Sequence, residues 1–79
     1  MAVKPPTEEG RRFFEKAVAD TWAMIAEERR HADRLVDEDG GVEARRKAKS
    51  IRISMSLWER STKRLIAWVD AENAKAVAS

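Results

Sequence analysis

The sequence contains no cysteine and no tyrosine, and it has a single histidine. Without cysteine, neither a disulfide nor a thiolate metal site can stabilise the fold, and the composition is compatible with a reducing compartment. Glycine and proline are scarce, with three and two residues in a chain of 79. Pro5 and Pro6 stand near the start, and Gly40 and Gly41 are adjacent in the middle. Long helices are therefore expected on either side of the two adjacent glycines.

Long apolar runs are also missing from the sequence. No stretch approaches the eighteen uninterrupted apolar residues of a membrane-spanning helix. The first six residues, MAVKPP, lack the apolar region of a secretion signal. These absences predict a cytoplasmic protein with no membrane partner.

The breaks in the sequence predict where helices begin and end. Thr7 can cap a helix whose first turn carries Glu8 and Glu9, because acidic groups suit the helix dipole there. The glycine pair after an acidic run predicts a turn. The expected fold is an all-α, antiparallel two-helix hairpin. Its predicted parts are an extended arm (1–6), a helix (7–37), a turn (38–41), a second helix (42–76) and a tail (77–79).

Apolar residues of the second helix recur at helical spacing and predict its contact with the first helix. This stripe consists of Ala44, Ala48, Ile51, Met55, Trp58, Thr62, Leu65, Val69 and Ala76. In an antiparallel hairpin with this turn, facing residues have numbers that sum to about 79, so Ile25 should face Met55 and Trp22 should face Trp58. Both tryptophans are therefore predicted to pack in the core.

Each predicted helix carries a second apolar group, turned away from the first by roughly 95–125° at about 100° per residue. A hairpin offers each helix only one neighbour, so these second groups predict contacts between chains. The expected oligomer interface comprises Phe13, Met24, Leu57 and Trp68. A four-helix dimer is the simplest closed assembly, and a ring of hairpins is the next.

Charge is unevenly distributed along the chain. Residues 7–39 contain ten acidic and six basic side chains, whereas residues 44–65 contain eight basic side chains and one acidic side chain. A line along the second helix is formed by Arg45, Lys49, Arg52 and Lys63. These four residues are the predicted nucleic-acid-binding site, because aligned cations bind phosphates without regard to base sequence. In the alternative interpretation, these bases pair with acids of the first helix or are simply solvated.

The sequence provides little for catalysis, since it has no glycine-rich phosphate loop and only His31 among the imidazoles. Glu28 and His31 have the spacing of a carboxylate-bridged metal site in a four-helix bundle. Such a site also needs a glutamate from the second helix at the same height, where this sequence has Ile51. We therefore expect no catalytic residues, no bound metal and no cofactor.

Two basic, alanine-containing stretches of the second helix carry a resemblance to a known family. The segments RKAKSI (46–51) and KRLIAW (63–68) resemble the last helix of small terminase subunits, the DNA-packaging proteins of tailed phages and gene-transfer particles. The resemblance implies a helical hairpin that assembles into a ring, binds double-stranded DNA and passes it to a packaging motor. No helix-turn-helix precedes the hairpin in this sequence, so DNA contact would fall to the basic line or the tails.

Together these features predict a non-enzymatic, self-associating adaptor that contacts nucleic acid. The alternative is a module for protein–protein interaction only, such as an inhibitor or a regulatory partner. The two interpretations differ in whether function depends on the four aligned bases.

Overall fold

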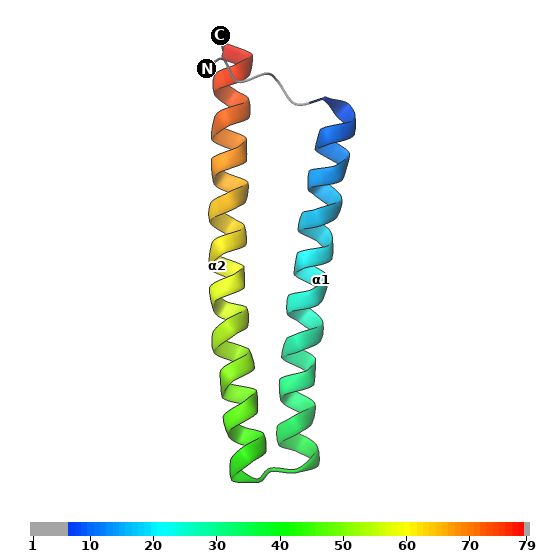
Figure 1. Cartoon of the computed structure of the whole chain (residues 1–79), viewed down its shortest axis with the longest axis vertical. Coiled ribbons are helices and arrows are strands. Elements are labelled where there is room, and N and C mark those ends of the chain that lie inside the picture. Colours follow the sequence, from blue (N-terminus) through cyan, green and yellow to red (C-terminus); the bar gives the residue numbers. More distant parts are fainter. Residues whose placement is uncertain (1–6, 79) are drawn as a thin grey trace.

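The computed structural model describes residues 7–78, which form two antiparallel helices side by side (Figure 1). Helix α1 spans Glu8–Glu38 and helix α2 spans Val42–Ala78. The predicted all-α hairpin is confirmed, and the described residues contain no strand. Val77, predicted in a tail, belongs to α2. The predicted arm (1–6) and residue 79 lie outside the described residues.

Local chemistry sets the start of α1 and the turn. The Thr7 hydroxyl accepts a hydrogen bond from the Gly10 amide at 3.0 Å, as expected of a helix cap. At the other end, the Asp39 amide donates to the Leu35 carbonyl, and Gly40 takes a left-handed conformation with φ of 66°. Glycine adopts this conformation without steric cost and so allows the chain to leave the helix.

Replacing Gly40 with alanine is expected to destabilise the hairpin by about 1–2 kcal/mol, the cost of a left-handed conformation for a residue with a Cβ. The added Cβ would meet its nearest neighbour, the Val36 carbonyl oxygen, at 3.5 Å, so the cost comes from the backbone and not from crowding. The control is Gly41→Ser at the neighbouring capping position, whose φ is not positive and whose added Cβ would meet the end of the Asp39 side chain at 3.1 Å, a contact that a small shift of this side chain relieves. Urea unfolding followed by circular dichroism should place only Gly40→Ala below the parent chain, and equal midpoints would contradict this account.

The core lies along the seam between the helices and is densest in the half nearest the turn. Its buried residues are Ile25, Ala32, Ala44, Ala48, Met55 and Thr62. Ala32 and Ala48 are fully buried, because small side chains let the two backbones approach closely. The Thr62 hydroxyl donates to the Trp58 carbonyl at 2.7 Å, so its burial leaves no polar group unpaired.

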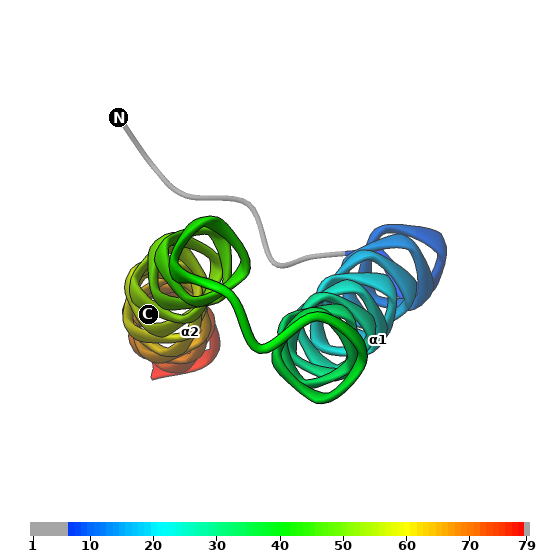
Figure 2. The same cartoon turned by 90° about the horizontal axis from the view of Figure 1, so that it is seen from below.

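Away from the turn the helices diverge, as both views show (Figure 1, Figure 2). Trp58 lies near the middle of α2 and is 51% exposed, so the prediction that it belongs to the core of the single hairpin is wrong. Trp22 is half-buried and lines a different groove from Trp58. The alanines buried near the turn are small enough for the backbones to come close, whereas the aromatic residues Phe14, Trp22 and Trp58 line open grooves between the helices.

Candidate nucleic-acid interface and apolar surface

The basic part of α2 carries a groove on the surface of the helix itself. Its lining residues are Lys49, Arg52, Ile53, Ser56, Leu57 and Arg60, all from α2. Three cations therefore surround two exposed aliphatic side chains and one hydroxyl. Cations supply attraction to phosphates, and the hydroxyl can donate a hydrogen bond to a phosphate oxygen.

The four predicted phosphate-binding residues fall into two groups. Arg45 and Lys49 are exposed and form no ion pair with any residue from 7 to 78. Arg52 instead reaches Asp33 of α1 at 2.7 Å, and Lys63 reaches Glu59 at 3.1 Å. The structure thus brings Lys49 and Arg52 to one groove, and two of the four bases already have acidic partners.

Glu59 is the centre of a small ion-pair network that links the helices. Arg29 of α1 donates to its carboxylate at 2.6 Å, and Lys63 lies on the other carboxylate oxygen. The hydrogen bond from Arg29, followed by that from Lys63, lowers the pKa of Glu59 below its ordinary value. Glu59 therefore stays ionised as the pH falls toward 4.5, the ordinary glutamate pKa, and its contribution to stability is lost only in stronger acid.

Arg60 belongs to this groove although sequence reasoning left it out of the basic line. It stands eleven residues after Lys49, which is about three helical turns, so the two side chains share a face. Among residues 7–78 it has no acidic partner. The helical spacing could have identified it, had the line been drawn from Lys49 instead of Arg45.

Most side chains of the predicted oligomer interface are exposed to solvent in the single chain. Phe13 is 77% exposed, Trp68 is 62% exposed and Leu57 is 56% exposed, whereas Met24 is half-buried. Leu65 is also about half exposed, beside Trp58. Large apolar side chains that are aligned in this way are typical of interaction surfaces.

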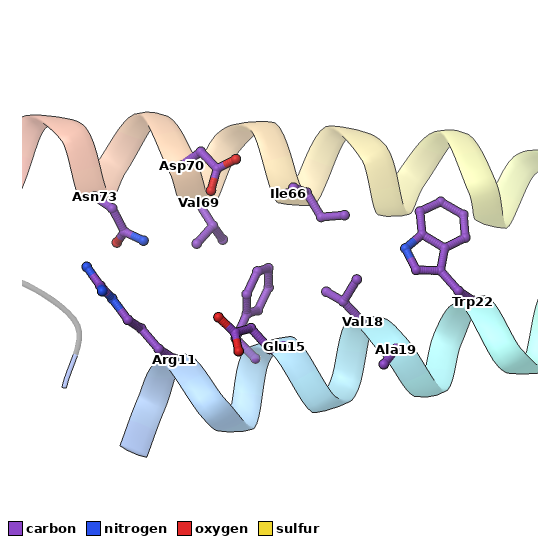
Figure 3. A pocket seen from close by; sticks show the side chains of 10 residues that line it. Arg11, Glu15, Val18, Ala19, Trp22, Ile66, Val69, Asp70 and Asn73 are labelled. Atoms are coloured by element: carbon purple, nitrogen blue, oxygen red, sulfur yellow. The ribbon is translucent and has the colours of Figure 1, made fainter. Parts of the chain in front are cut away.

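Two grooves run between the diverging helices, one on each side of the seam. The first has a volume of about 570 Å³, with Trp22 and Ile66 toward one end and Arg11, Asp70 and Asn73 toward the other (Figure 3). The second is lined by Trp58 and Leu65 of α2 and by Ala17 and Thr21 of α1. Phe14 and Val18 line both grooves and form the ridge between them.

The described residues hold no group of three histidine, cysteine or carboxylate side chains that could bind a metal ion. His31 is exposed on α1. Neither described helix is both long and apolar enough to cross a membrane.

Comparison of the chain with protein-family models, with curated proteins and with solved structures found no match. What the chain does must therefore be inferred from its own surfaces: the basic groove on α2 and the exposed apolar residues of both helices.

Proposed function

We propose that this chain is a non-enzymatic, self-associating helical hairpin that contacts nucleic acid through the basic surface of α2. The observation that carries the proposal is a set of exposed cations on α2 that have no acidic partner in the described chain: Arg45, Lys49 and Arg60. The same hairpin also exposes large apolar residues to solvent. Cations that are not already neutralised can bind phosphates and release counterions.

Self-association strengthens this proposal because each copy repeats the basic surface. A weak contact per chain becomes appreciable when two or more copies engage one duplex. Binding is then expected to be insensitive to base sequence and to weaken steeply as salt rises.

Changing Arg45, Lys49, Arg52 and Lys63 to glutamine is expected to abolish binding to duplex DNA. These side chains are exposed, and the two ion pairs lost on the surface contribute only about 0–1 kcal/mol each, so the hairpin should stay folded. The measurement is a fluorescence-anisotropy titration at low and at physiological salt, with helicity checked by circular dichroism.

A matched control removes the same charge from α1, by changing Arg11, Arg12, Lys16 and Arg34 to glutamine. This variant should keep most of the affinity if α2 is the contact surface. Equal losses in both variants would show that only net charge matters, and absence of binding by the parent chain at low salt would refute the nucleic-acid role.

One observation favours the alternative of a protein–protein module. Arg52 and Lys63 are held by Asp33 and Glu59, which reduces the charge that remains for phosphates. Under this alternative the apolar residues bind a protein partner, and the glutamine variant on α2 keeps full function.

The most specific form of our proposal is a small DNA-packaging subunit, which the resemblance of 46–51 and 63–68 to small terminases implies. The hairpin fold agrees in outline with the oligomerisation region of those proteins. A gene for a packaging motor beside the gene for this chain would support this form of the proposal.

A further inference from the structure

The two sides of the hairpin differ in chemistry. On one side, ion pairs bridge the helices: Arg29 with Glu59 and Arg52 with Asp33. The other side, here called the apolar side, contains the groove that Ala17, Thr21, Trp58, Ser61 and Leu65 line. No ion pair between the helices is found on the apolar side of residues 7–78.

Helical spacing extends the apolar side beyond this groove. Met24 follows Ala17 by seven residues on α1, and Trp68 follows Ser61 by seven residues on α2. Seven residues are about two helical turns, so Met24 and Trp68 lie on the same face as the groove. Leu57 precedes Ser61 by four residues, about one helical turn, and lies at the edge of this side, where it also lines the basic groove.

The apolar side is arranged in layers along the hairpin. Small side chains occupy the middle: Ala17 and Thr21 on α1 and Ser61 on α2. Toward the open end stand Phe14, Leu65 and Trp68, and toward the turn stand Met24, Leu57 and Trp58. A second surface with the same order of layers would match large side chains with large ones and small with small.

Charge indicates which surface can cover this side. The α1 part of the chain (7–39) has a net charge of −4, whereas residues 44–65 of α2 have a net charge of +7. A second copy of the chain offers both signs. If α2 of the second copy lies on α1 of the first, α1 of the second copy also lies on α2 of the first. Each acidic helix then faces a basic helix.

We propose that a second copy of this chain packs on the apolar side, with the two-fold axis parallel to the helices. The proposal rests on the self-association stated above and specifies its surface and direction. Each α1 then lies on the α2 of the other copy, and both turns lie at the same end. The axis preserves height along the hairpin, so Phe14 meets Leu65 and Trp68, and Met24 meets Leu57 and Trp58.

The other two-fold arrangement, with its axis perpendicular to the helices, stacks α1 on α1 and α2 on α2. It sets the two basic helices against each other, and like charges in contact disfavour an interface. The parallel axis also leaves Lys49, Ser56 and Arg60 on the outer surface of the dimer, because Leu57 is the residue of their groove that borders the apolar side.

Two alanines on α1 test which side is covered. Both are exposed in the single chain, but Ala17 lines the groove on the apolar side, whereas Ala19 lines the groove on the other side. Ala17→Glu is expected to weaken dimerisation at least tenfold and Ala19→Glu to leave it unchanged, as measured by sedimentation equilibrium. Loss of the dimer in Ala19→Glu alone would overturn the proposed surface.

A spin label at residue 38 tests the direction. The chain has no cysteine, so Glu38→Cys provides one labelling site beside the turn. In the proposed dimer the two labels lie at the same end, and double electron–electron resonance should give a distance below about 30 Å, given helix separations of roughly 8–10 Å. A dimer with labels more than about 40 Å apart, at opposite ends of hairpins 57 Å long, would overturn the direction and leave self-association intact. If the labelled chain is monomeric and its labels show no dipolar coupling, self-association itself is refuted.

Discussion

Replacing Leu57 and Trp68 together with glutamate is expected to dissociate the assembly into single chains of 9.0 kDa. Both side chains are more than half exposed in one hairpin, and in the proposed assembly another chain covers them. Burying a large apolar side chain stabilises an interface by about 1.5–3 kcal/mol. Losing two of them should weaken association at least a hundredfold, since about 1.4 kcal/mol corresponds to a factor of ten. Size-exclusion chromatography with light scattering gives the mass directly.

A matched control places glutamate at two other exposed apolar positions of α2. Val42 is 67% exposed and Val77 is 75% exposed, and helical spacing sets both away from the apolar side. Val42→Glu with Val77→Glu should therefore keep the parent mass. If this control dissociates while the Leu57 and Trp68 variant remains assembled, the interface has been assigned to the wrong residues.

Ile25→Ala is expected to destabilise the hairpin by about 2–5 kcal/mol, the usual cost of truncating a buried isoleucine. Ile25 is 2% exposed and is the largest aliphatic residue of α1 in the core. A single core in a chain of this size rarely supplies more than about 3–5 kcal/mol. The variant should therefore be largely unfolded at 25 °C, which far-ultraviolet circular dichroism would show as a loss of helicity.

The same truncation at Ile53 provides the control, because Ile53 is 53% exposed. Ile53→Ala removes the same atoms from a helix surface and should leave the melting temperature close to that of the parent. Equal stability of the two variants would mean that the seam near the turn does not hold the helices together.

The hairpin could be predicted because this sequence interrupts its helices at few points. Thr7 and Gly40 mark the start of α1 and the turn by local chemistry alone, a side-chain cap and a left-handed backbone. The end of α2 has no such signal in the sequence. The helix consequently runs to Ala78, two residues beyond the predicted end.

Apolar periodicity identified the buried stripe near the turn but not how far apart the helices stand. Ile25 and Met55 are buried as expected, whereas Trp58, on the same stripe, is 51% exposed. Periodicity gives the direction in which a side chain points, and the distance to the neighbouring helix depends on the bulk of every residue along the seam. Trp58 instead lines the groove on the apolar side of the hairpin, where the second copy is proposed to lie.

The four residues of the basic line are exposed on α2, but the partner of Arg52 could not be read from α2 alone. Arg52 meets Asp33 and Lys63 meets Glu59, and the first of these pairs depends on how the helices are rotated against each other. Arg60, without an acidic partner in the described chain, is the residue that the line omitted.

The most direct test of self-association is the mass of the parent chain in solution. Sedimentation equilibrium at micromolar concentration should give about 18 kDa, twice the 9.0 kDa of one chain, if two hairpins cover each other's apolar side. A mass of 9.0 kDa at the same concentration, with the chain helical and folded, would contradict the central claim.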